Sequence, residues 1–165
     1  MASTGYKKSW LLCISGAYNA TKRVDLALVS KKTDAEVIQP LIEALWWVYA
    51  ADESLKEEYP SEWSKLRSNL PELPLLLGLR WIRNRVTHQI SQWEIAKPPF
   101  QWGDARIIAP PGSVSADRDH GRTEYISHLQ GNDARDAISV VVDAIRKEAT
   151  GKLPPGSKRS GGISS

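Results

Sequence analysis

The chain has few of the residues on which disulfide, metal and membrane chemistry depends. A single cysteine, Cys13, occurs among 165 residues, which excludes an internal disulfide framework and a zinc site built from several cysteines. It also fits a reducing compartment. The apolar run at 11–14 is short and followed by polar residues, so we expect no signal peptide and a cytoplasmic protein. No apolar run approaches the ~20 residues of a membrane span, so we expect no membrane partner.

Phenylalanine and methionine are scarce, with one residue of each, whereas seven tryptophans are present. Exposed tryptophans can stack nucleobases, but most of these fit better as core or interface side chains. Both interpretations stay open, with Trp102 the one considered for ligand contact. Cys13 lies on or beside the apolar face of the first expected helix. A small buried hydrophobe is therefore a better interpretation of it than a nucleophile.

The net charge of +3 comes from the C-terminal tail. Lys152, Lys158 and Arg159 follow Gly151; without these three bases, 19 basic residues balance 19 acidic ones. The body is therefore neutral and lacks the broad basic surface of a strong RNA binder. Residues 152–165, rich in Gly, Pro and Ser, predict a disordered basic tail. Locally, acids predominate at 52–62 and bases at 63–97.

Hydrophobic periodicity predicts four long helices in one domain that covers 1–151. They are expected at about 7–29, 33–59, 75–95 and 132–150. The capping box from Thr33 to Glu36 and the N-cap at Asn132 mark two helix starts. The apolar face of the second helix is widened by a further stripe, which predicts burial on two sides; this stripe consists of Ile38, Ile42, Trp46 and Tyr49.

The fold class is therefore all-α, as a four-helix up-down bundle. The short link at 30–32 favours an antiparallel first pair. An irregular or extended insertion at about 98–131 precedes the last helix and contains a short helix near 123–130. We expect Gly151 to stop the last helix.

The third helix contains the most informative pattern in the chain. Its core stripe comprises Leu75, Leu79, Ile82, Val86, Ile90 and Trp93. Arg80, Asn84 and His88 follow one another at a spacing of four, on a different face. Guanidinium groups bind phosphate through paired donors, and imidazole titrates near neutrality. Such a helix can bind a phosphodiester and transfer a proton.

The sequence Leu79-Arg-Trp-Ile-Arg83-Asn84-Arg-Val-Thr-His88 resembles the signature of the HEPN superfamily. These are small helical-bundle domains, many of them metal-independent ribonucleases. Their motif is an arginine, often followed by asparagine, with four to six residues between the arginine and a histidine. Here Arg83 precedes Asn84 and four residues separate it from His88, on the third long helix, where the family has its motif.

The resemblance implies a homodimer in which two motif helices form one composite site. RNA would be cleaved by attack of a 2′-hydroxyl on the adjacent phosphate, in prokaryotic or viral defence or stress response. His88 would be the general acid or base, and Arg83 would stabilise charge on the phosphoryl oxygens. Asn84 would orient His88 or the phosphate. Substrate binding would involve Arg80, Arg85 and Thr87, and the dimer contact Leu77 and Trp81.

The helix geometry agrees with a composite site, because Arg83 and His88 lie about 140° apart on the helical wheel. Neither metal nor cofactor is needed by this mechanism. In toxin–antitoxin pairs of the family with small nucleotidyltransferases, a tyrosine commonly lies two residues after the histidine. Ile90 occupies that position here and disfavours that subtype.

Other interpretations remain open. A non-catalytic HEPN-like module could bind a regulatory protein, a nucleotide or nucleic acid, which the neutral body and an exposed Trp81 would favour. A plain dimeric scaffold is a third possibility. The arginines could simply pair with the acids at 52–58, and His88 could be a surface or capping residue. The remaining histidines, His120 and His128, lie near Asp117, Asp119 and Glu124, but irregular spacing favours surface placement over a metal site.

Overall fold

The computed structural model describes residues 9–30, 32–89 and 121–153, without the side chains of Asp34 and residues 85–89. The elements in chain order are α1 (Ser9–Val29), α2 (Asp34–Glu58), α3 (Pro60–Ser68), α4 (Leu73–Gln89), the π-helical turn η2 (Tyr125–Leu129) and α6 (Ala134–Lys152). These three ranges are mainly helical and contain no strand. The prediction of an all-α protein is therefore confirmed for them.

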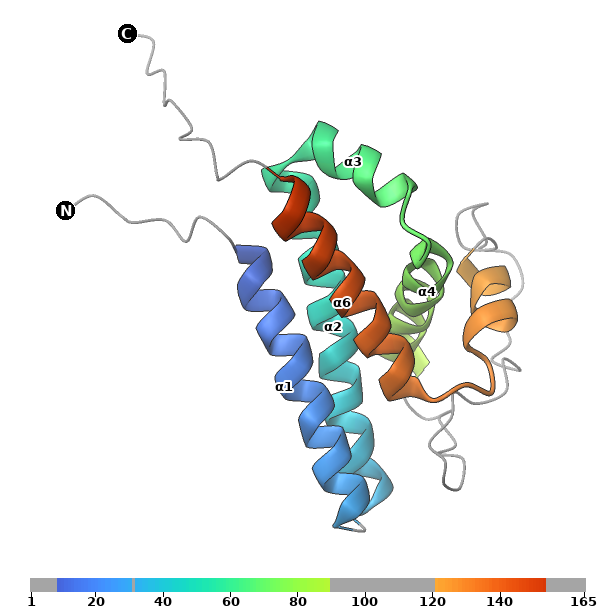
Figure 1. The fold of residues 1–165 in the computed structure, drawn as a ribbon. Coiled ribbons are helices and arrows are strands. Elements are labelled where there is room, and N and C mark those ends of the chain that lie inside the picture. The colour runs from blue at the N-terminus through green and yellow to red at the C-terminus, as the bar shows by residue number, and fades with distance from the viewer. Residues whose placement is uncertain (1–8, 31, 90–120, 154–165) are drawn as a thin grey trace, which may run out of the picture.

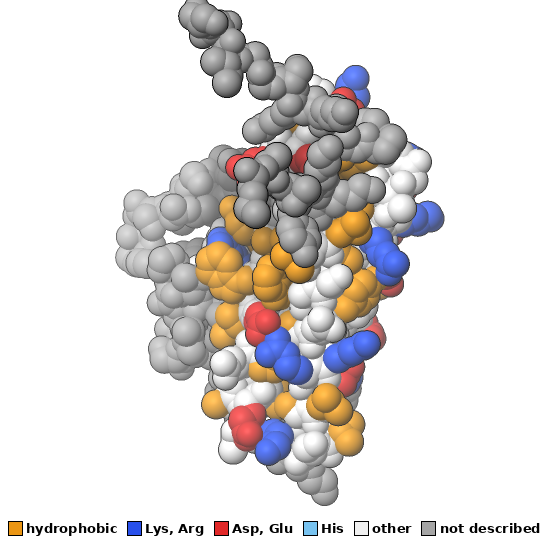
Figure 2. Space-filling view, turned by 90° about the vertical axis from the view of Figure 1, so that its left-hand side faces the viewer, with side chains coloured by type: hydrophobic (Ala, Val, Ile, Leu, Met, Phe, Trp, Pro, Cys, Tyr) orange, Lys and Arg blue, Asp and Glu red, His pale blue; other side chains and the backbone are white. Residues whose placement is uncertain are grey.

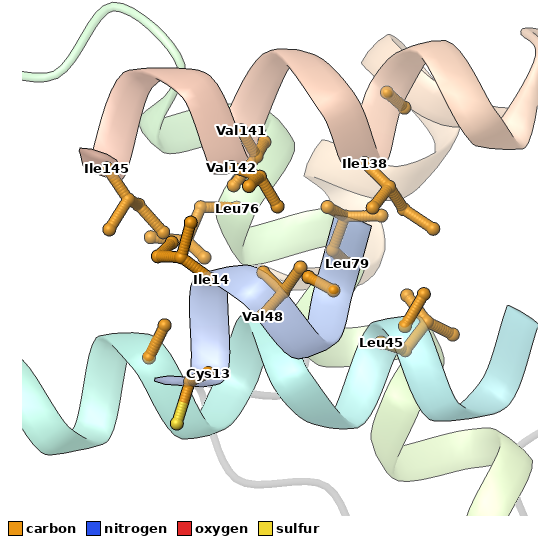
Figure 3. Close-up of a cluster of buried hydrophobic side chains, with 14 of the residues drawn as sticks. Cys13, Ile14, Leu45, Val48, Leu76, Leu79, Ile138, Val141, Val142 and Ile145 are labelled. Atoms are coloured by element: carbon orange, nitrogen blue, oxygen red, sulfur yellow. The ribbon is translucent and has the colours of Figure 1, made fainter. Parts of the chain in front are cut away.

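The helices pack side by side around a common interior. α1 and α2 run antiparallel along most of their length, α6 lies against both, and α4 packs on α2 and α6 (Figure 1). The core contains Cys13 and Ile14 from α1 and further apolar side chains from α2, α4 and α6 (Figure 3). Because all four long helices bury apolar side chains in one cluster, the described ranges form one packed unit.

Local signals place the helix starts. The backbone N–H of Thr33 donates to Glu36 Oε2 at 3.0 Å, as the capping box predicts, and α2 begins at the next residue. The start of α6 differs by one residue from the prediction. Asp133, not Asn132, is the N-cap, and its carboxylate accepts from the Arg135 N–H at 2.8 Å. Gly151 does not stop α6, which continues to Lys152.

The short helix α3 was not anticipated. It contains few apolar residues, so periodicity hardly reveals it, but its termini follow known rules. Pro60 occupies the first turn, where its missing N–H has no cost. Glu62 lies in the first turn and Lys65 and Arg67 in the last, which suits the helix dipole. Its Trp63 is fully buried and anchors α3 to the rest of the molecule.

The end of the insertion is helical, as expected near 123–130, and it packs closely on α4. Helical residues from 121 continue into η2. A Cβ at Gly78 would lie 2.6 Å from Leu129 Cδ1 and 3.2 Å from the backbone of Tyr125. Glycine at this position therefore allows α4 and η2 to approach. The expected helix end at 90–95, the rest of the insertion and the tail from residue 154 on lie outside the described residues. The prediction that the disordered tail begins at residue 152 is wrong for Lys152, which is the last residue of α6.

The surface of the described part mixes apolar and charged side chains. On the side where α1 lies, Figure 2 shows hydrophobic side chains interrupted by lysine, arginine and carboxylate groups. Leu12, Leu26 and Val29 of α1 are among the exposed apolar residues. None of the described helices combines the length and the apolar character that crossing a membrane requires.

Replacing Gly16 by alanine is expected to destabilise the protein, although alanine favours helices by about 1 kcal/mol. A Cβ there would lie 2.5 Å from the indole ring of Trp47, and such overpacking costs about 1–3 kcal/mol. Gly151→Ala is the control, because a Cβ at Gly151 meets nothing within 4 Å. Urea unfolding should show a loss of stability for Gly16→Ala only; equal stability of the two variants would contradict the packing argument.

Candidate functional site

Helix α4 presents the arginines of the motif. The helix is continuous from Leu73 to Gln89, so Arg80, Asn84 and His88 lie on successive turns, as predicted. The side chains of Arg80, Arg83 and Asn84 are described, whereas those of Arg85, Thr87 and His88 are not. The structure therefore brings Arg83 and Asn84 together but leaves the placement of the His88 imidazole as a prediction.

Arg80 points to the C-terminal half of α2. Its Nη1 lies 2.7 Å from Asp52 Oδ2 and 2.9 Å from Glu53 Oε1. The guanidinium also lies 4.9 Å from the ring centroid of Tyr49. This is the pairing with the acidic segment that the sequence left open as an alternative. Arg80 is therefore an ion-pair partner of these two acids, with its side chain 25% exposed, and its expected role in substrate binding stays a prediction.

Asp52 connects three helices through one buried carboxylate. Its side chain is fully buried and accepts hydrogen bonds from Trp63 Nε1 at 2.9 Å and Arg67 Nε at 2.9 Å, both on α3, and from Arg80 on α4. Burial alone would raise the pKa of Asp52. The charges of Arg67, Lys56 and Arg80 and the Trp63 hydrogen bond outweigh it and hold that pKa below its ordinary value.

Arg83 lies on aromatic side chains of α2. Its Cζ is 3.6 Å from the ring centroid of Trp46 and 4.0 Å from that of Tyr49, and Nη1 donates to Asn84 Oδ1 at 2.7 Å. Cation–π contacts contribute about 0.5–2 kcal/mol and also fix the orientation of the guanidinium. We call Trp46, Tyr49, Arg83 and Asn84 the Arg83 platform.

The platform remains accessible at the protein surface. The side chain of Asn84 is exposed, that of Arg83 is half-buried, and Trp46 is 43% exposed. The apolar stripe that widens α2 is therefore not buried at Trp46, and the prediction of burial on two sides is wrong there. Because Asn84 Oδ1 accepts from Arg83, the Nδ2 amino group is the end of this amide that can donate to a ligand.

Trp81 lies in the core, and the expectation that it is exposed is wrong. It is only 5% exposed, and its ring centroid lies 5.0 Å from that of Tyr125 in η2. The η2 segment covers the face of α4 that the wheel left open, which a helix considered alone cannot show. Of the two residues expected at a dimer contact, Leu77 is only partly buried and keeps some accessible surface.

Sequence reasoning missed the aromatic support from α2 and the contribution of α3 to this region. Trp46, Tyr49 and Glu53 recur at spacings of three and four, so they share the face of α2 that meets the arginines of α4. Complementary spacing on α4, with Arg80 and Arg83 one turn apart, was the available signal. Nothing in the sequence identifies which of the acids at 52–62 is buried.

The other candidate residues are Cys13 and the histidines and nearby acids of the insertion. Cys13 is buried, and burial raises the pKa of its thiol, which fits a small buried hydrophobe. His128 is exposed and lies 3.2 Å from Glu124. Across the described ranges, no group of three or more His, Cys, Asp or Glu side chains has the geometry to hold a metal ion. His120, Asp117 and Asp119 lie outside these ranges.

Comparison with known proteins gives no match: no family model fits the chain, and neither curated proteins nor solved structures show significant similarity to it.

Proposed function

We propose that the chain is a HEPN-like, metal-independent endoribonuclease with a four-helix up-down core, which acts as a homodimer in prokaryotic or viral defence or stress response. The observation that carries this proposal is the pairing of Arg83 with Asn84 at the surface of a continuous helix, with His88 five residues further on. A guanidinium and an amide donor held side by side suit two oxygens of one phosphodiester.

In the proposed reaction, a 2′-hydroxyl of RNA attacks the adjacent phosphorus and the bond from phosphorus to the 5′-oxygen breaks. His88 of one protomer accepts the hydroxyl proton and then gives a proton to the leaving 5′-oxygen, acting first as base and then as acid. Arg83 stabilises the charge that develops on the phosphoryl oxygens. The products are a 2′,3′-cyclic phosphate and a 5′-hydroxyl end.

Two copies of the motif are needed for this reaction, because Arg83 and His88 of one copy do not face the same phosphate. A separation of about 140° around the helix directs Arg83 and His88 of one copy to different sides. A second motif helix would supply the missing partner, and partly buried Leu77 would lie at the contact. The cytoplasm is the proposed compartment, and a regulatory protein partner would restrain the activity.

A second candidate function is a non-catalytic binding module, which the ion pairs of Arg80 favour. With Arg80 held by Asp52 and Glu53, fewer cationic groups remain to engage phosphate. The Arg83 platform could then bind a nucleotide or nucleic acid without reaction. Binding that does not depend on His88, without cleavage, would select this function.

The test is incubation of purified protein with total RNA and with tRNA in EDTA, followed by mapping of the product ends. We expect cleavage that leaves cyclic phosphate ends and is lost in His88→Ala and Arg83→Ala. His128→Ala is the matched control, since His128 is exposed on η2 and is not part of the motif on α4. Unchanged cleavage by His88→Ala would overturn the proposal.

A further inference from the structure

The exposed indole of Trp46 distinguishes it from the other described tryptophans. Trp10, Trp63 and Trp81 are at most 5% exposed, and Trp47 is half-buried against Gly16. Trp46 is 43% exposed in the middle of α2, between the buried neighbours Leu45 and Val48 of the core face. Its side chain is therefore not needed to fill the core, so another role can explain an aromatic ring here.

The structure holds this indole in a fixed orientation. Arg83 covers the ring at 3.6 Å from its centroid, and the same guanidinium contacts Tyr49 of the next helical turn at 4.0 Å. Since Arg83 occupies one side of the indole, a ligand that stacks on Trp46 would use the opposite side. An aromatic surface whose rotamer is already fixed loses little conformational entropy when a flat ligand stacks on it.

The charge around the indole favours an anionic ligand. Arg83 lies on the indole and is bonded to the Asn84 amide, whereas the acids of α2 on the neighbouring turns are engaged in ion pairs. Glu43, one turn before Trp46, contacts Arg23. Asp52 contacts Arg67, Arg80 and Lys56, and Glu53 contacts Arg80 and Lys56. A planar apolar surface next to a fixed cation is the combination that a nucleobase and its neighbouring phosphate require.

We propose that Trp46 forms a base-stacking subsite for single-stranded RNA, with Arg83 binding the phosphate next to the stacked base. This inference rests on the proposed function and specifies its substrate, because bases in a duplex are stacked on their neighbours and cannot lie on the indole. Stacking tolerates every base, so the subsite selects unpaired strands rather than a sequence, with purines favoured by their larger rings.

The test measures binding separately from cleavage. Fluorescence anisotropy with a labelled ten-nucleotide 2′-O-methyl oligoadenylate reports Kd, since the blocked 2′-oxygen prevents reaction. We expect Trp46→Ala to raise Kd by about 5- to 150-fold, the effect of losing one stacked base. Trp46→Phe, which keeps a ring, should lose less. Val140→Ala is the control, because Val140 is a similarly exposed apolar residue on α6 and should bind as wild type does.

Cleavage assays on the same variants separate this proposal from the ribonuclease proposal. If RNA is cleaved, Trp46→Phe should raise KM more than it lowers kcat. Oligonucleotide binding that depends on Trp46, without cleavage by any protein, would support the subsite and overturn the nuclease. Cleavage of RNA, together with oligonucleotide binding that does not depend on Trp46, would support the nuclease and overturn the subsite.

Three further results would overturn the subsite. One is failure of the wild type to bind the oligonucleotide. The second is equal competition by single strands and by a duplex of the same sequence. The third is a Trp46→Ala protein that changes its oligomeric mass but not its affinity per dimer, which would assign the indole to a contact between protomers. Thermal unfolding of both Trp46 variants verifies that they are folded.

Discussion

Asp52→Ala is expected to lower the free energy of unfolding by about 3–5 kcal/mol, the usual cost of removing one partner of a buried ion pair. The variant loses a carboxylate that accepts from Trp63, Arg67 and Arg80. The Arg67 guanidinium and the Trp63 indole N–H would then lose this acceptor in a partly desolvated site, and Arg80 would keep only Glu53. Urea unfolding followed by circular dichroism gives the change directly.

Glu53→Gln is the control for this prediction. Glu53 binds the same Arg80 and Lys56, but its side chain is 39% exposed. Ion pairs at such positions contribute about 0–1 kcal/mol because water screens them. If the Asp52 variant lost no more stability than the Glu53 variant, the buried carboxylate would not be the link between α2, α3 and α4.

The pH dependence of stability provides a second measurement on the same residue. The folded-state pKa of Asp52 lies below its ordinary value of 3.8, despite the opposing effect of burial. The stabilisation is therefore fully present above about pH 4 and is lost as the pH falls through the lowered folded-state pKa. Wild type should lose stability on acidification in this window, and Asp52→Asn should lose less.

The sequence predicts the helices whose apolar residues recur regularly and whose ends carry capping residues. α1 and α2 end within about two residues of their expected bounds, because periodicity and the capping box are local signals. α3 escaped prediction because Trp63 and Leu66 are too few apolar residues to reveal a period. Its role depends on a contact with Asp52, eleven residues before Trp63 in the chain.

The candidate site shows the same division between local and non-local information. The spacing of Arg83 and Asn84 on one helix could be predicted, and the structure places their side chains together. The aromatic support from Trp46 and Tyr49 and the burial of Trp81 by η2 depend on which helices meet. A single helical wheel contains no information on either, so they appear only once the packing of α2, α4 and η2 is known.

Mixing two inactive variants is expected to restore ribonuclease activity if the site is shared between protomers. His88→Ala alone should lower the cleavage rate by about 10²–10⁴-fold, the contribution of a general acid or base. Arg83→Ala should also be inactive, because it removes the stabilising charge. In a mixed dimer, one protomer retains His88 and the other retains Arg83, so one complete pair can form across the interface.

The measurement is the cleavage rate of the separate variants and of an equimolar mixture after subunit exchange. Random exchange produces mixed dimers in about half of the population, so a substantial rise above both variants is expected. Mixing each variant with the double variant Arg83→Ala/His88→Ala is the control, because those mixed dimers lack one of the two groups entirely. A mixture no more active than its components would show that Arg83 and His88 act within one chain or do not act together, and would exclude the composite site.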